Sequence, residues 1–248
     1  MKSTRAEGHP VQLQVLPDRE ALIATATDRL AHRLSELATN RDRIAIALAG
    51  GSTPAPVYAG LATRDLPWAR MQVFWGDERW VPPDHPDSNY GMARRTLLSQ
   101  VSIPAAQIHP MPTDLPSPAE AAAVYEQTLQ HICGAPPQLD LVLLGMGDDG
   151  HTASLFPHTA ALTAPGWVTV GDRQGQPRLS LTAATINAAR QVWFLISGAD
   201  KADALAAVLA VEGDGDRYPS RLIHPAGELC FMVDAPAAAK LPPEWLNR

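Results

Sequence analysis

The chain has 248 residues, of which 46% are apolar, and a formal net charge of −6. This composition provides a substantial hydrophobic core and excludes a disordered chain. A mildly acidic surface also argues against non-specific binding to nucleic acid or anionic membranes, since both need clustered Lys and Arg. We therefore expect neither as a partner.

The N-terminal residues 1–10 are predicted to form a flexible tail, because they are polar and lack periodicity. They contain no apolar segment typical of a signal peptide, and no apolar run approaches the ~18 residues that a membrane span needs. Cys133 and Cys230 each lie beside apolar residues, which favours buried free thiols over a disulfide. These features predict a cytoplasmic protein with one α/β domain over residues 11–248.

The first elements of this domain are an edge strand and a long helix. Residues 11–16 alternate between apolar and polar side chains. Asp18 is then placed to cap a helix whose apolar residues recur at helical spacing up to Asn40. The same pattern predicts helices over residues 118–132 and 200–211.

Five later runs are short and almost wholly apolar, as in strands buried on both faces of a parallel sheet. They span residues 44–49, 71–75, 139–144, 192–196 and 229–233. Strand and helix alternate along the chain, which predicts an open, mostly parallel α/β sheet. Residues 167–170 and 178–181 are expected to form a small hairpin beside it.

In such sheets, ligands bind outside the carboxyl ends of the strands. The first loop at such an end begins with Gly50 and Gly51, which allow a tight turn and close backbone approach. Ser52 or Thr53 is expected to cap the next helix, with Pro54 at its first position. This arrangement suits a phosphate, although an ordinary well-capped turn would look the same. The lysine of a Walker A loop is missing.

The second loop places two acids and an arginine together at a strand end. Arg79 can bind phosphate or carboxylate through its planar fork. Asp77 or Glu78 can act as a base or orient a sugar hydroxyl. The alternative is a surface ion-pair cluster. Residues 87–90 add a turn or helix-cap signal.

The third loop, residues 145–157, is rich in glycine and carries His151. Its opening matches the dinucleotide fingerprint, but Asp148 and Asp149 would put negative charge where a pyrophosphate lies, and the first strand is far upstream. We favour a loop that delivers His151 as a general base, since imidazole titrates near neutrality. A metal held by Asp148, Asp149 and His151 is not expected, because the spacing lacks helical ligand geometry.

Two further cations follow later strands. Arg178 belongs to the second hairpin segment. Lys201 lies near a helix start, where a cation is unfavourable for the helix dipole, which suggests anion binding, although a solvated lysine remains possible. Nucleophilic serine catalysis is not indicated, because no G-x-S-x-G motif is present.

Taken together and in this order, the three loops resemble the 6-phosphogluconolactonase family. The matching segments are residues 50–54, 77–82 with Ser88 and Asn89, 145–157, 178–182, 198–202 and 219–220. The resemblance covers nearly the whole chain after residue 10, with Ser180 standing where a threonine is more usual. It implies a doubly wound, mostly parallel sheet with helices on both faces, shared with glucosamine-6-phosphate deaminases.

The resemblance also implies hydrolysis of 6-phospho-D-glucono-1,5-lactone to 6-phospho-D-gluconate in the oxidative pentose phosphate pathway. It implies a monomer that needs no cofactor and no metal. His151 would be the general base, with Asp77 assisting. The expected substrate-binding residues are Gly50, Gly51, Ser52, Thr53, Arg79, Arg178 and Lys201. Two points stay open: which of Asp77, Asp148 and Asp149 assists His151, and which loop N–H groups stabilise the oxyanion.

Three other functions were weighed against this one. A deaminase acting on glucosamine 6-phosphate has the same fold, but the segments 79–82 and 152–157 are more similar to the lactonases. A sugar-phosphate sensor would need an added DNA-binding region, for which no basic helix-turn-helix pattern is visible. A dinucleotide oxidoreductase is disfavoured by the acids of the third loop.

Overall fold

The structure is a computed structural model that describes residues 2–4 and 10–246. Over these residues, the main sheet has seven strands in the order β1-β2-β10-β9-β6-β3-β4, all parallel except β1. Its strands are β1 (Lys2–Thr4), β2 (Pro10–Leu16), β3 (Ile44–Leu48), β4 (Met71–Trp75), β6 (Leu141–Leu144), β9 (Gln191–Ile196) and β10 (Glu228–Asp234). The five predicted apolar strands and the strand over residues 11–16 are therefore confirmed, with small shifts at their ends.

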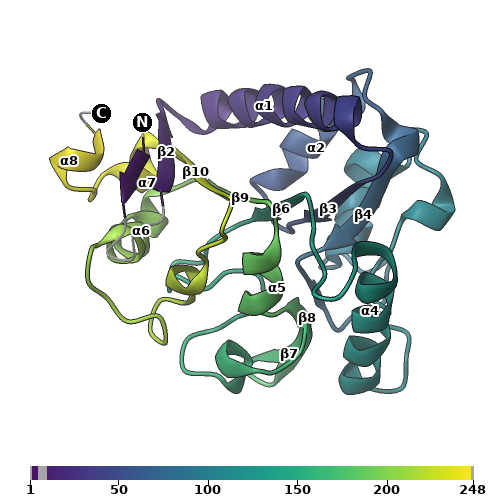
Figure 1. Cartoon of the computed structure of the whole chain (residues 1–248). Helices are drawn as coiled ribbons and strands as arrows, with labels where there is room; N and C mark the ends of the chain where they lie inside the picture. The colour runs from purple at the N-terminus through teal and green to yellow at the C-terminus, as the bar shows by residue number, and fades with distance from the viewer. Residues whose placement is uncertain (1, 5–9, 247–248) are drawn as a thin grey trace.

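Helices cover both faces of this sheet, as predicted (Figure 1). The α-helices are α1 (Arg19–Asn40), α2 (Pro54–Ala62), α3 (Asn89–Ala93), α4 (Pro118–Cys133), α5 (Ala183–Ala188), α6 (Ala202–Leu209), α7 (Ala235–Ala238) and α8 (Pro243–Leu246). Short turns of other helix types are η1 (Trp68–Arg70), η2 (Arg94–Leu98), η3 (Ala105–Gln107), η4 (Ala160–Thr163), η5 (Ala199–Lys201) and η6 (Pro219–Leu222). In the described chain, no helix is both long and apolar enough to cross a membrane.

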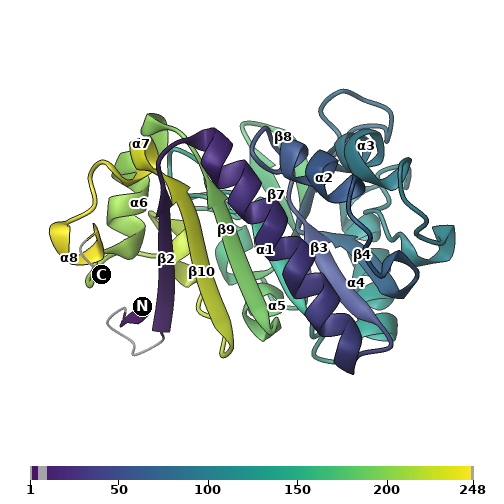
Figure 2. The same ribbon diagram turned by 90° about the horizontal axis from the view of Figure 1, so that it is seen from above.

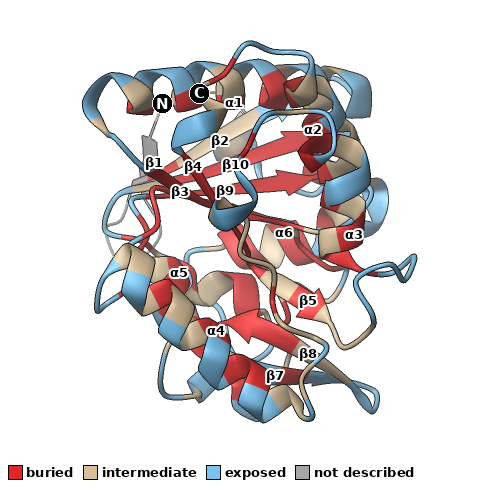
Figure 3. Cartoon of the chain, turned by 90° about the vertical axis from the view of Figure 1, so that its right-hand side faces the viewer, coloured by how far each residue is buried: buried red, intermediate tan, exposed pale blue. Residues whose placement is uncertain are grey.

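The strands are apolar on both sides because each side faces a separate core. In β3, Ile44 and Ile46 pack with α1 and α2, whereas Ala45 and Ala47 pack on the side of α4. The strands β3, β4, β6, β9 and β10 are accordingly buried along most of their length, and the outward faces of the helices are exposed (Figure 3). The period-2 alternation of a strand thus sorts its side chains between two helical layers.

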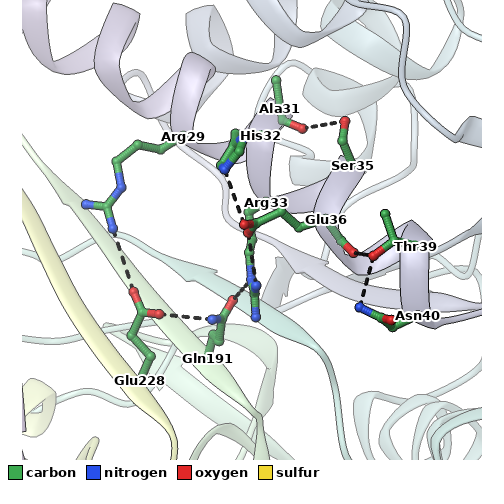
Figure 4. Close-up of polar contacts among 10 residues, drawn as sticks. All are labelled: Arg29, Ala31, His32, Arg33, Ser35, Glu36, Thr39, Asn40, Gln191 and Glu228. Carbon is green, nitrogen blue, oxygen red and sulfur yellow. Dashed lines mark hydrogen bonds and ion pairs between the residues drawn. The ribbon is translucent and has the colours of Figure 1, made fainter.

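The long helix α1 crosses one face of the sheet (Figure 2). Its first turn is capped as predicted: the Asp18 side chain accepts a hydrogen bond from the Ala21 N–H at 2.8 Å. Toward the starts of β9 and β10, polar side chains of α1 meet polar side chains of the sheet (Figure 4). Arg33 donates to Gln191 at 2.8 Å, and Gln191 donates to Glu228 at 2.9 Å. Arg29 lies 3.7 Å from Glu228.

A second, antiparallel sheet holds the predicted hairpin, β7 (Val168–Arg173) and β8 (Gln176–Leu181). A third strand, β5 (Asp77–Arg79), pairs with β8. Residues 77–79, which follow a predicted strand, are expected from the sequence to form a loop. They form a strand because their partner lies about a hundred residues later in the chain, where no local pattern could reveal it.

Three other expectations are modified. Within the tail predicted over residues 1–10, Lys2–Thr4 pair with β2, while residues 1 and 5–9 lie outside the described residues. The helix expected over residues 200–211 begins as the 3₁₀ turn η5 and continues as α6. Cys133 and Cys230 are free, as expected, but only Cys230 is fully buried. The division into a tail and one domain stays a prediction.

Candidate active site

A cavity of about 390 Å³ opens at the carboxyl ends of the parallel strands. It is lined by the segments that follow β3, β4, β6 and β9. From β3 the chain moves outward to β4, whereas from β6 it moves the other way to β9 and β10. The cavity therefore lies at the topological switch point, where open α/β sheets bind their ligands.

All nine candidate site residues line this single cavity. They are Gly50, Gly51, Ser52, Thr53, Asp77, Arg79, His151, Arg178 and Lys201. The lining also includes residues that the sequence analysis did not assign to the site: Asn89, Met146, Arg173, Ser197 and Asp200. Arg173 lies just before the Gln174–Gly175 turn of the hairpin, so its approach to the cavity depends on tertiary packing.

His151 is held by Asp149, one of the three acids considered as its partner. The His151 Nδ1 atom lies 2.6 Å from Asp149 Oδ1, and the same oxygen accepts the His151 backbone N–H at 3.0 Å. Burial alone would raise the pKa of Asp149, but the hydrogen bonds from His151 outweigh it and lower this pKa to about 2. An ionised Asp149 favours the tautomer with the proton on Nδ1, which leaves Nε2 as an acceptor.

Glycines let the third loop fold tightly beneath the imidazole. A Cβ atom at Gly147 would lie 2.0 Å from His151 Nδ1. The Gly147 N–H donates to the His151 carbonyl at 2.9 Å. Gly150 has φ +78°, and its carbonyl accepts from both the N–H and the hydroxyl of Ser220, at 2.9 and 2.8 Å. The loop is therefore built to hold His151 in one orientation.

Asp77 is oriented by groups other than His151. Its Oδ2 accepts from the Ser154 hydroxyl at 2.8 Å, and its Oδ1 lies 3.2 Å from the Asn89 amide nitrogen. A Cβ at Gly50 would lie only 1.7 Å from the Asn89 amide oxygen, so glycine is required for this approach. The Ser154 N–H donates to Ser180 at 3.1 Å. The hydroxyl at position 180 is thus used, whether Ser or Thr supplies it.

Glu78 points away from the cavity and organises the second loop. Its carboxylate is 2% exposed and accepts the backbone N–H groups of Arg79, Asn89 and Tyr90 at 2.7–2.8 Å. The Ser88 hydroxyl donates to it as well, at 3.0 Å. Burial raises the pKa of Glu78, and the three N–H groups oppose that rise. Glu78 is therefore a structural anchor for the second loop, in which Ser88 also caps α3 as predicted.

Three guanidinium groups make the cavity strongly positive on one side. Burial and the nearby positive charges of Arg79 and Arg173 lower the pKa of Arg178. The Nε atoms of Arg79 and Arg178 are buried and have no hydrogen-bond partner within the described part of the chain. Buried donors without partners are costly, and guanidinium groups that line a cavity suit a phosphate or carboxylate ligand.

The first loop lines the cavity, but no side chain of it caps α2. Thr53 occupies the N-cap position of α2 without a capping hydrogen bond from its side chain, so this expectation was wrong. Its φ and ψ of −79° and −45° are helical, whereas a capping side chain needs an extended backbone. Pro54 is in the first turn, as predicted. The Ser52 and Thr53 side chains, without a capping role, remain available to a ligand.

Lys201 lines the cavity from η5. Its Nζ is 2.9 Å from Asp200 Oδ2, and its side chain is 21% exposed. The positive charge of Lys201 is therefore partly neutralised by Asp200 in the same turn. In the described residues, no group of three or more His, Cys, Asp and Glu side chains is arranged to hold a metal ion.

Fold and site together define an α/β protein with an arginine-lined cavity at the switch point and a histidine–aspartate pair at its wall. The model of the family described as glucosamine-6-phosphate isomerases/6-phosphogluconolactonase matches residues 17–231. This match covers most of the chain, and the chain belongs to that family.

Similar proteins agree with this assignment. A 6-phosphogluconolactonase of Nostoc sp. is 51% identical over 234 residues, which cover 92% of this chain and 98% of the relative. The 6-phosphogluconolactonase structure from Trypanosoma brucei superposes with a TM-score of 0.84 at 31% identity, over 94% of this chain and all of that one. A monomeric glucosamine-6-phosphate deaminase shares the fold, with a TM-score of 0.79 at 20% identity, over 92% and 99% of the two chains.

Proposed function

We propose that this protein hydrolyses 6-phospho-D-glucono-1,5-lactone to 6-phospho-D-gluconate, the lactonase step of the oxidative pentose phosphate pathway. The observation that carries the proposal is the placement of His151, already bonded to Asp149, in the same cavity as Arg79, Arg178 and Lys201. One group can thus activate water while the others hold the phosphate. The 51% identity to a lactonase supports the choice of substrate.

In the proposed reaction, His151 is the general base. With Nδ1 donating to Asp149, Nε2 removes a proton from water, and the oxygen attacks C1 of the lactone. The carbonyl oxygen becomes an oxyanion in the tetrahedral intermediate. The protonated imidazole then gives its proton to the ring oxygen as the ester bond breaks. This cycle consumes one water and returns His151 to its starting state.

The first loop is the better candidate for the oxyanion donors. The Gly147 N–H is already engaged by the His151 carbonyl, at 2.9 Å, so it is not free for substrate. Residues 50–53 line the cavity before the first turn of α2, where backbone N–H groups are unpaired and the helix dipole is positive. We assign the oxyanion to these N–H groups.

Arg79 and Arg178 are assigned to the 6-phosphate, with Lys201, Ser52 and Thr53 adding donors. Binding energy from the remote phosphate positions C1 against the activated water. Asp77 faces the cavity with its carboxylate already oriented by Ser154, which suits an acceptor for a sugar hydroxyl. We further propose that the protein acts as a cytoplasmic monomer.

The test is acid release from freshly prepared 6-phosphoglucono-1,5-lactone, followed after subtraction of the spontaneous hydrolysis. We expect release far above background. If the protein does not accelerate it, the proposal is wrong, and ammonia release from glucosamine 6-phosphate then tests the other activity in the family description. Plain gluconolactone serves as the matched substrate control. Equal turnover of both lactones would contradict the assignment of a phosphate pocket.

A further inference from the structure

Phe156 lies directly behind the wall of the cavity. His151, Arg173 and Arg178 line the cavity, whereas Phe156 is 5% exposed and packs behind them. Its backbone is fixed locally, because the Leu155 N–H donates to Thr152 at 3.0 Å and the Thr159 hydroxyl donates to the Phe156 carbonyl at 2.8 Å. The ring therefore has a defined place independent of any ligand.

This one ring contacts three groups of the site. The His151 ring centroid lies 4.7 Å from that of Phe156, with the two planes tilted by 44°. The guanidinium carbons of Arg173 and Arg178 lie 5.6 and 5.8 Å from the Phe156 centroid. These three groups come from two separate segments, the third loop and the β7–β8 hairpin. Phe156 is thus the point at which the proposed base and two cations are held together.

The contacts of the Phe156 ring also affect the electrostatics of the two arginines. Two guanidinium groups close together repel each other, and the Arg178 Nε atom has no hydrogen-bond partner among the described residues. The negative face of an aromatic ring attracts a cation within about 6 Å. Unlike a carboxylate, the ring does this without neutralising the positive charge. The ring therefore holds the two arginines in place without reducing their positive charge.

We propose that Phe156 is a positioning residue that orients Arg173 and Arg178 toward the anionic substrate and supports the His151 ring from behind. It acts through these residues and does not touch the substrate. Arg173 thereby becomes a third arginine of the anion site, in addition to Arg79 and Arg178. The expected kinetic effects rest on the proposed function. The contacts of Phe156 with the three side chains do not depend on it.

The kinetic test compares two matched substitutions, Phe156→Leu and Phe231→Leu. Phe231 is a buried phenylalanine of β10 that stacks on Phe194, so its substitution removes a buried ring from a strand of the main sheet. We expect Phe156→Leu to raise KM for the phosphorylated lactone about 5- to 20-fold, as two cation–π contacts imply, and to lower kcat a few-fold. Phe231→Leu should lower Tm and leave KM unchanged. Equal effects of the two variants on KM would overturn the proposal.

A second series isolates the electrostatics from packing. Replacing Phe156 alone by mono-, di- and trifluorinated phenylalanine weakens the negative face of the ring with little change of shape. KM is expected to rise step by step along the series, and a constant KM would rule out the cation–π role.

Side-chain NMR decides the geometry without substrate. The guanidinium signals of Arg173 and Arg178 should be shifted by the ring current in the wild type and should lose this shift in Phe156→Leu. Unchanged signals would overturn the inference whatever the activity. If the wild type fails to hydrolyse the lactone but these signals move, the proposed function is wrong and the positioning role stands.

Discussion

Two charged clusters of this molecule lie toward opposite ends of the parallel strands of the main sheet and differ in how their charges are paired. Between α1 and the starts of β9 and β10, the arginines have partners: Arg33 bonds to Gln191, and Arg29 faces Glu228 (Figure 4). Near the carboxyl ends of the strands, Arg79 of β5 lies beside Arg178 of β8. The buried Nε donors of both have no hydrogen-bond partner in the described chain. Both clusters are half-buried, so burial does not distinguish them.

The difference shows how a structural cluster can be told from a binding site. A network whose donors all find acceptors inside the protein stabilises the fold and has little left for a ligand. A group of like charges with unmet donors costs stability by itself, and a bound anion offsets this cost. Substitutions in the two clusters should therefore change different quantities.

The largest effect is expected at the base. His151→Ala should lower kcat by about 10²–10⁴-fold, because general-base assistance is lost, while product still binds. Steady-state kinetics and calorimetry with 6-phosphogluconate measure the two quantities. His158→Ala is the matched control, since His158 is exposed and paired with Asp216. A kcat for His151→Ala equal to that of the control would remove His151 from the mechanism.

Asp149 and Asp148 allow a direct comparison, because they are adjacent in sequence and Asp149 is the one that bonds to His151. Asp149→Asn should lower kcat on the order of 10²-fold, because an amide no longer favours the Nδ1–H tautomer of His151. Asp148 is exposed and next in sequence, so Asp148→Asn should leave kcat nearly unchanged. If both variants lost kcat equally, loop charge rather than the contact with His151 would be responsible.

Substituting one arginine of each cluster tests the comparison between the two clusters directly. Arg178→Ala should raise KM about 10- to 100-fold, as expected for the loss of a charged hydrogen bond to substrate, with little loss of Tm. Arg33→Ala should do the reverse: KM unchanged and Tm lower by about 2–4 °C, if the bond to Gln191 contributes about 1 kcal/mol. A fall in Tm for both variants with KM unchanged in both would abolish the distinction between the clusters.

The smallest effect concerns pH and stability. The folded protein holds the pKa of Asp149 at about 2, below its ordinary value of 3.8. The stabilisation from Asp149 is therefore present above pH ~4 and is lost as the pH falls through about 2. Because this side chain is 41% exposed, we expect less than about 1 kcal/mol. Urea unfolding of wild type and Asp149→Asn from pH 2 to 6 should show a difference that vanishes toward pH 2; a difference constant with pH would contradict it.

Much of the fold was predictable because its signals are local. Short apolar runs bounded by glycine identify strands that are buried on both faces, and Asp18 marks the start of α1 through its own side chain. The three loops could be placed at the same end of the sheet, since the carboxyl ends of parallel strands all lie there. The pairing of β5 with β8 could not be predicted, because its two strands are distant in sequence and β5 is only three residues long.

Within the candidate site, the sequence by itself determined which loops meet and which side chains can carry the chemistry, because residue type and position after a strand are local properties. Only the tertiary structure decided that Asp149 and not Asp77 holds His151, that Thr53 does not cap α2, and that Arg173 and Phe156 join the site. Each of these depends on backbone angles or on contacts between segments brought together by folding. Such contacts are set by the packing of the whole sheet and its helices, and no short pattern in the chain encodes them.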